Sequence, residues 1–296
     1  MDARHRPHTT TTESATTRKD PTMTTITIPT TTPAAGTTAP TTARRPGVRA
    51  ATRSEWIKLR SLRSTPALLA ITALIGVAMT VVLGAVVKTD PYEHLPFTLG
   101  NTLVVSTLLS TMLAMVAGTL LFTSEVQHGT LAVAFTARPA RRVVVVAKAV
   151  VAAGLGLAMG ATGMVGSLIG GVSSGMDTGD LSGAPAQVAW GLVLTTFAAV
   201  LGLGVGMIVR HSAAAVTSVL VWSLAVENLV RGMAPSSVSR FFPFSAADRL
   251  LGTRAATDSA ETLAAALPKI ANAAIFGAYA AIAVAVGTAI VMRKDS

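Results

Sequence analysis

The sequence predicts an all-α polytopic membrane protein with six transmembrane helices, an N-terminal interfacial helix and short outer helices between spans five and six. Six apolar stretches are long enough to cross a bilayer, because a membrane-spanning helix needs ~20 mostly apolar residues. Charged residues make up only 13% of the 296-residue chain, against about 25% in a typical soluble domain. The predicted spans are 66–87, 101–123, 143–172, 187–209, 213–230 and 271–292.

The N-terminal residues 1–50 differ in composition from the rest of the chain. Threonine runs, such as Thr9 to Thr12, alternate with prolines and contain few apolar residues. Such a segment buries too little apolar surface to offset the entropy of ordering it, so we expect a disordered tail. No apolar h-region precedes residue 66, which argues against a signal peptide, and Met23 is an alternative start. The membrane domain is expected over 51–296.

The segment that follows the tail predicts a helix lying in the membrane interface. Ser54 can cap its N-terminus, and Glu55 then lies in the first turn, where the helix dipole favours an anion. Trp and Arg side chains suit the headgroup region. The interfacial residues are Trp56, Leu59 and Leu62 at spacing three, flanked by Arg60 and Arg63. Thr65 and Pro66 predict a cap and a fresh helix start for span one, although a simple extension of that span stays open.

Glycines on spans three and four predict closely packed helices. Glycine at spacing four lets two helix backbones approach each other in a membrane. These glycines are Gly156, Gly160, Gly163, Gly166, Gly170, Gly202 and Gly206. The spacing fits packing within one subunit and a dimer face equally well.

Basic residues near the span ends orient the chain, because Lys and Arg are enriched on the cytoplasmic side. The predicted inner side holds Arg49, Arg53, Lys58, Arg60, Arg63, Arg138, Arg141, Arg142, Lys148, Arg210, Arg293 and Lys294. The predicted outer side holds Lys88, no basic residue in 173–186, and an exceptional cluster after span five. We therefore expect a multi-pass protein of the cell membrane with both termini cytoplasmic. The net charge of +10 indicates contact with membrane lipids rather than with nucleic acid.

The inner connection between spans two and three predicts either a docking surface for a cytosolic partner or a routine link. Glu125 lies where span two leaves the membrane, and Gly129 can end the helix. Residues 131–136 are apolar but too short to span, so we expect a short surface helix there. The pair Arg141 and Arg142 leads into span three.

The outer segment 231–270 is long for a plain connection and is expected to contain structure. Its FFPF stretch predicts a turn at the outer interface. Ser245 can cap a short helix that starts near Ala246, and 258–267 can form a second helix.

The sequence contains none of the common nucleotide-binding, zinc-binding or hydrolase motifs. It contains no G-x-x-x-x-G-K-[ST] phosphate-binding loop, no H-E-x-x-H zinc motif and no G-x-S-x-G elbow. Cysteine is absent and the five histidines are scattered. We therefore expect no enzymatic activity, no cofactor and no metal site in this chain.

Glu227 is the one acidic residue inside a predicted span. An ionised group near the bilayer centre costs at least ~2.5 kcal/mol, so such residues are functional candidates. Glu227 lies one turn from the outer end, however, and precedes Arg231 by four residues. That spacing favours an interfacial ion pair. A role in substrate passage or gating stays open.

Three segments, in this order along the chain, resemble parts of ABC-2 type transporter permeases, especially actinobacterial ones. SEWIKLRSLRSTP resembles the interfacial connecting helix of that family, and SEVQHGTLAVAFTARPARRVVVVAKA resembles its cytoplasmic stretch after span two. FFPFSAADRLLG is similar to the outer Pro-Phe motif before the last span. The resemblance covers about residues 52–296.

The resemblance implies the membrane-spanning permease subunit of an ABC transporter, an exporter of a drug, antibiotic or lipid-like substrate. It implies a separate ATP-binding subunit and a second permease subunit, in a homodimer or a heterodimer. The residues implied to contact the ATP-binding subunit are Glu125, His128, Gly129, Arg138, Arg141 and Arg142. The alternative is a non-transporting membrane tether or sensor.

Overall fold

The computed structural model describes residues 47–61, 63–89, 98–130, 141–176, 181–253 and 266–294. These ranges contain helices and no strand, which confirms the all-α class. Six of the helical segments within them are long and apolar enough to cross a membrane. They are Ser64–Val86, Leu99–Gln127, Arg142–Ser173, Ala184–Val209, Ser212–Met233 and Lys269–Arg293. Each predicted span coincides with one of these helical segments to within a few residues.

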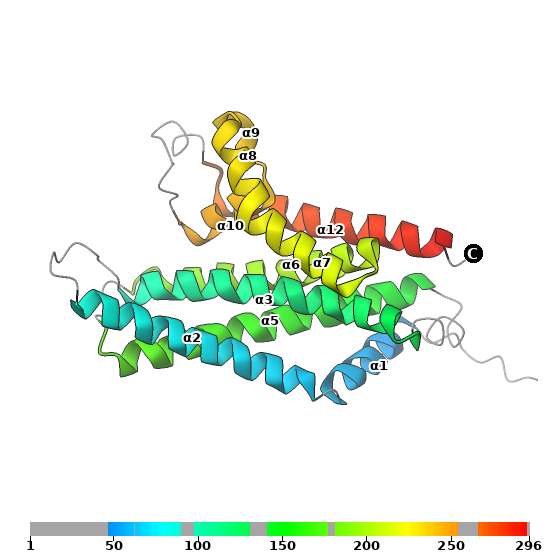
Figure 1. The fold of residues 1–296 in the computed structure, drawn as a ribbon, viewed down its shortest axis with the longest axis horizontal. Helices are drawn as coiled ribbons and strands as arrows, with labels where there is room; N and C mark the ends of the chain where they lie inside the picture. Colours follow the sequence, from blue (N-terminus) through cyan, green and yellow to red (C-terminus); the bar gives the residue numbers. More distant parts are fainter. Residues whose placement is uncertain are drawn as a thin grey trace, which may run out of the picture. The chain divides into compact units, whose positions relative to one another are not determined.

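The helices follow one another along the chain in an order that Figure 1 shows. They are α1 (Val48–Ser61), α2 (Ser64–Thr89), α3 (Leu99–Gln127), α5 (Arg141–Ser173), α6 (Ala184–Val209), α7 (Ser212–Val221), η1 (Trp222–Val226), α8 (Glu227–Met233), α9 (Ser236–Ser239), α10 (Pro243–Leu251) and α12 (Lys269–Lys294). Together α7, η1 and α8 form span five. We call the end of the spans where α3 finishes and α5 begins the α1 end, and the opposite end the α10 end.

Helices α3, α5 and α6 form the centre of the packing. Helix α3 packs against α5 and α6, while α2 packs against α5 and α12 against α6. Glycines permit the closest of these contacts: a Cβ atom on Gly202 would overlap the carbonyl oxygen of Met115, and one on Gly118 would overlap that of Ala199. The predicted glycine spacing on spans three and four therefore serves packing within one subunit. Van der Waals contact of this kind drives helix association in lipid.

Span five is less enclosed than its neighbours. Helix α7 packs against α3 and α6. Five residues, Trp222–Val226, form a π-helix between α7 and α8, and such bulges are frequent at functional sites. Apolar side chains on this span are exposed, including those of Trp222, Leu224 and Leu229. This exposure suits a helix that faces lipid on one side.

The start of α1 differs from the prediction, which placed the helix N-terminus at Ser54. The helix begins at Val48, and the amides of Ala50 and Ala51 already donate to the Gly47 carbonyl oxygen. The earlier start places Ala51 against the protein, where it is fully buried. The predicted tail, apart from its last few residues, lies outside the described ranges.

The predicted break between α1 and span one is confirmed. Helix α1 ends at Ser61, and α2 begins at Ser64, one residue before the predicted cap Thr65. The Thr65 hydroxyl donates to the Leu59 carbonyl oxygen at 2.6 Å across the corner. This bond satisfies a carbonyl that the ended helix leaves without an intrahelical partner.

The predicted cap at Ser245 is wrong, because α10 begins two residues earlier, at Pro243. Proline suits the first helical position, since its ring pre-sets φ and it has no N–H to leave unpaired. The helix ends at Gly252, whose φ of 78° is left-handed. The short helices expected over 131–136 and 258–267 lie outside the described residues.

Candidate functional site: a buried ion cluster

Helix α1 places two oppositely charged side chains next to each other. Glu55 and Lys58 are three residues apart, and the Lys58 Nζ donates to the Glu55 Oε1 at 2.7 Å. Ala51, Glu55 and Leu59 recur at spacing four and are buried, so they form one face of the helix. This face carries the carboxylate inward, because α1 packs against α5.

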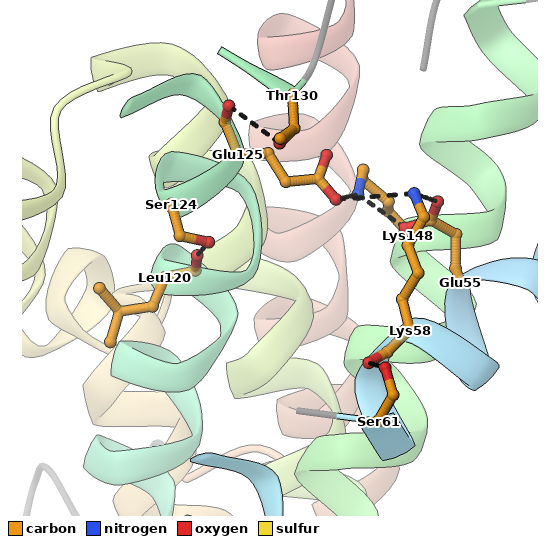
Figure 2. A network of polar contacts seen from close by, with 8 residues as sticks. All are labelled: Glu55, Lys58, Ser61, Leu120, Ser124, Glu125, Thr130 and Lys148. Carbon is orange, nitrogen blue, oxygen red and sulfur yellow. Dashed lines mark hydrogen bonds and ion pairs between the residues drawn. The ribbon is translucent and has the colours of Figure 1, made fainter. Parts of the chain in front are cut away.

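Lys148 of α5 joins this carboxylate to a second one from α3. Its Nζ donates to the Glu55 Oε2 at 2.7 Å and to the Glu125 Oε1 at 2.6 Å. The Lys148 side chain is only 1% exposed. Figure 2 shows the three helices meeting at this ammonium group. We call Glu55, Lys58, Glu125 and Lys148 the ion cluster.

The ion cluster is electrically neutral, with two carboxylates and two ammonium groups. The half-exposed Lys58 also lies 4.0 Å from the Glu125 Oε1. Pairing is required here, because a buried charge without a partner is costly in a low-dielectric interior. One acceptor stays open: the Glu125 Oε2 is buried and has no hydrogen-bond partner among the described residues.

The ion cluster changes the pKa of Glu55. Burial raises the pKa of this carboxyl, but the charge of Lys148 and the hydrogen bonds from Lys148 and Lys58 outweigh burial. The net pKa of Glu55 lies below its ordinary value. Glu55 is therefore ionised at neutral pH, and its contacts to the two lysines are ion pairs.

The ion cluster also lies at both flanks of the connection between α3 and α5. Glu125 belongs to the last turn of α3, and Lys148 lies about two turns into α5. His128 ends α3 and places its Nδ1 2.7 Å from the Ser124 carbonyl oxygen. Gly129 follows with a φ of 68°. Lys148 therefore links α1 to the last turn of α3 and the start of α5.

Comparison with protein families decides what kind of protein carries this site. A family model described as ABC-2 family transporter protein matches residues 51–227, more than half of the chain. The chain belongs to the ABC-2 transporter family. It is an ABC transporter permease and a multi-pass membrane protein. The matched region begins in α1 and ends at Glu227, so it contains the whole ion cluster. No curated protein and no solved structure matches the chain.

The predicted coupling residues of this ABC-2 permease occupy different environments. Glu125 points toward Lys148, and its side chain is only 19% exposed. His128, Gly129 and Arg142 are exposed at the α1 end. Arg138 and the side chain of Arg141 lie outside the described residues. The exposed members are available to a partner, whereas Glu125 belongs to the interior.

The predicted interfacial residues, which lie in α1 and just after it, also occupy different environments. Leu59 is buried, whereas Arg60 and Arg63 are exposed, and Leu62 lies outside the described ranges. Trp56 is partly exposed, and its ring lies over Gly154 of α5. The face of α1 that packs against the protein therefore passes through Ala51, Glu55 and Leu59. The placement of Trp56 and the two arginines in the membrane interface stays a prediction.

The role of Lys148 was missed in the sequence, where it counted only toward topology. A signal was present, because Lys148 lies five residues inside the predicted span 143–172. An ionisable residue inside a span generally has a partner. Glu55 was not identified as that partner, because its predicted position in the first turn of a helix already accounted for an acidic residue there.

Glu227 makes more contacts than the predicted ion pair. Its Oε1 lies 3.5 Å from the Arg231 Nη2, and it accepts a shorter bond of 2.7 Å from the Ser245 amide. Arg231 in turn donates through Nη1 to the Asp248 Oδ2 at 2.8 Å. Glu227 and Arg231 therefore both attach span five to α10.

Proposed function

We propose that this permease is the membrane-spanning part of an exporter whose ATP-binding subunit is a separate chain and docks at the α1 end. The observation that carries the proposal is the ion cluster. It joins α1 to both flanks of the α3–α5 connection through a single buried ammonium. ATP hydrolysis belongs to the partner, and two permease subunits pair over two ATP-binding subunits.

The packing supports a mechanical route from the connection into the membrane. A push on the connection moves the end of α3 and the start of α5, and Lys148 carries α1 with them. Helix α2 follows α5 and α6 follows α3, because these pairs pack closely. Such packed bodies move by small shears or as rigid units. The cargo is a drug, antibiotic or lipid-like molecule, and the α1 end is cytoplasmic.

Reversing the charge of Arg142 is expected to abolish binding of the ATP-binding subunit. Arg142 is exposed next to the connection, so Arg142→Glu alters the docking surface without removing a buried contact. The measurement is purification of the tagged permease from native membranes in mild detergent, followed by mass spectrometry of the bound chains. Wild type is expected to retain an ABC ATP-binding subunit, and Arg142→Glu to lose it.

Arg293→Glu is the matched control for this experiment. Arg293 is also exposed at the α1 end but belongs to another helix, α12, and not to the flanks of the connection. It is expected to retain the bound subunit. Equal retention by both variants would refute docking at the connection. Absence of any ABC ATP-binding subunit from the wild-type preparation would favour the alternative of a non-transporting tether or sensor.

The proposed orientation is testable because the chain has no cysteine of its own. Gly47 precedes α1 and Gly183 precedes α6 at the opposite end, and a Cβ atom at either meets nothing within 4 Å. A membrane-impermeant maleimide is expected to label Gly183→Cys in intact cells. Gly47→Cys is expected to react only after permeabilisation. The reverse pattern would place the α1 end outside, where no cytosolic motor reaches it.

A further inference from the structure

A cavity of about 390 Å³ lies between span five and the helices around it. Met115, near the middle of α3, lies on one side, and Trp222, at the middle of span five, lies on another. Phe242 and Phe244, at the start of α10, and Tyr279 of α12 complete the aromatic part of the lining. The cavity therefore lies within the membrane-spanning part of one subunit, at a distance from the ion cluster at the α1 end.

The lining determines the chemistry of a suitable ligand. Four aromatic residues line the cavity, although only 4% of the chain is aromatic. Aromatic faces favour offset or edge-on contact with other rings. Among the residues that the structure describes, no charged one lines the cavity, so a charged ligand would be desolvated without a counter-ion from them. The volume falls within the range of about 300–1,000 Å³ that drug-sized ligands occupy.

Within the described part of the lining, the polar side-chain groups are the hydroxyls of Ser218 and Tyr279. The Ser218 hydroxyl already donates to the Ala214 carbonyl oxygen at 2.7 Å. The Tyr279 hydroxyl makes no hydrogen bond to another described residue, so it is available to a ligand. A few polar groups in an otherwise apolar pocket orient the ligand. The suitable ligand is thus an uncharged, ring-bearing molecule with at most one or two polar groups.

The route into the cavity follows from exposure. Trp222 is 50% exposed and Tyr279 is 40% exposed, so the lining reaches the surface of the subunit at membrane depth. A membrane-dissolved molecule can therefore enter from the side, without passing through water.

Glu227 holds the α10 side of the cavity in place. It accepts a bond of 2.7 Å from the Ser245 amide, next to Phe244 in the cavity wall, and Arg231 binds Asp248 of the same helix. Glu227 is 2% exposed, and its Oε2 has no hydrogen-bond partner within the described part of the chain. The π-helix that begins at Trp222 leads directly to Glu227. Span five thus supplies one cavity wall and the anchor for another.

We propose that this cavity binds an uncharged, ring-bearing apolar molecule taken from the bilayer, and that Glu227 keeps its α10 side closed. The identification of this ligand as the cargo depends on the proposed export function, whereas binding itself does not. Glu227 acts as a positioning residue, because it acts through Ser245 and α10 and does not line the cavity.

The test is photolabelling of the full-length permease in phosphatidylcholine nanodiscs with an uncharged iodophenyl diazirine. Labelling of the cavity residues is expected to saturate with probe concentration, whereas labelling of the exposed Leu224 and Leu229 outside the cavity is expected to rise linearly. Ser218→Trp fills the cavity and is expected to reduce the saturable part at least fivefold. Thr217→Trp introduces the same side chain at an exposed neighbour that is not among the described lining residues, and is expected to label like wild type.

Three outcomes would overturn the binding site. They are linear labelling of the cavity residues, equal labelling of the two Trp variants, and a phospholipid in the cavity, detected by native mass spectrometry, that the probe does not displace. Saturable labelling in a protein that exports nothing would leave the site intact and refute the export proposal. The experiment therefore distinguishes failure of the binding site from failure of the export proposal.

Glu227 is tested by the rate at which bound probe leaves. Glu227→Leu removes the acceptor for the Ser245 amide and is expected to speed dissociation several-fold, measured as saturable labelling left at intervals after dilution into empty liposomes. Glu227→Gln keeps a carbonyl oxygen for that amide and is expected to restore slow dissociation. Both variants are first checked for monodispersity by size exclusion. If bound probe dissociated from Glu227→Leu at the same rate as from wild type, Glu227 would not close the cavity.

Discussion

Lys148→Met is expected to cause the largest loss of stability of any single substitution in the ion cluster. The variant leaves the Glu55 Oε2 and the Glu125 Oε1 facing each other without the ammonium that both now bind. Removing one partner of a buried ion pair costs about 3–5 kcal/mol, and the half-exposed Lys58 that remains compensates the two carboxylates only in part. At about 2–4 °C per kcal/mol, the melting temperature falls by roughly 10 °C. Size-exclusion profiles after stepwise heating in mild detergent measure this fall.

The neutral triple variant is the control for this prediction. Glu55→Gln, Glu125→Gln and Lys148→Met together remove the buried charges, and most of the lost stability is expected to return. Replacing a complete buried ion network is often neutral, in contrast to breaking it. Lys58→Met is expected to cost under about 1 kcal/mol, because Lys58 is half-exposed and such pairs contribute little. A melting temperature for Lys148→Met within 2 °C of wild type, on the order of 1 kcal/mol or less, would contradict the assignment.

Gly202→Ala is expected to disrupt the α3–α6 contact, one of the closest helix contacts among the described residues. The new Cβ atom would overlap the Met115 carbonyl oxygen, which is part of the α3 backbone and moves only if the helix moves. Overpacking of this kind costs about 1–3 kcal/mol. We expect a fall of several degrees in melting temperature in the same heating assay.

Gly232→Ala is the matched control, since a Cβ atom there meets nothing within 4 Å. Its stability is expected to stay level or to rise by about 0.5–1 kcal/mol, because alanine favours the helix more than glycine does. Gly118→Ala enters the same α3–α6 contact from the other helix, where it would overlap the Ala199 carbonyl oxygen. The stability loss of the double variant Gly118→Ala/Gly202→Ala is therefore expected to be smaller than the sum of the losses of the two single variants. Equal stability of Gly202→Ala and Gly232→Ala would contradict the packing argument.

The glycine contact between α3 and α6 and the ion cluster lie in different parts of the same helices. Gly118 and Gly202 hold α3 and α6 together within the membrane, whereas Lys148 ties α1 to α3 and α5 at one end. A motor that acts on the α3–α5 connection needs both features, because a loose α3–α6 contact would absorb the movement. Loss of coupling with retained ATP-binding-subunit association is thus the expected behaviour of variants that weaken the ion cluster.

The six spans were predictable from the sequence because crossing a bilayer is a local requirement. Each span must satisfy its own backbone hydrogen bonds and cover them with apolar side chains, so the signal lies within about 20 consecutive residues. The break before α2 was predictable for a similar reason, since Thr65 and Pro66 carry it locally. The boundaries of α1 and α10 differ from the prediction for two reasons that capping preferences do not reveal. Helix α1 starts earlier because Ala51 packs against the rest of the protein, and α10 starts earlier because Pro243 occupies its first position.

What the sequence alone determined is therefore the class of protein, its six spans and the segments that resemble the ABC-2 family. Tertiary structure alone decided that Glu125 turns inward to Lys148, that Glu55 completes the pair, and that Glu227 binds the start of α10. It also brought residues of α3, span five, α10 and α12 around one cavity. The physical reason is that a charge inside a membrane protein requires a partner, but the sequence does not state which helix supplies it. That choice depends on which helices pack together over distances of many residues along the chain.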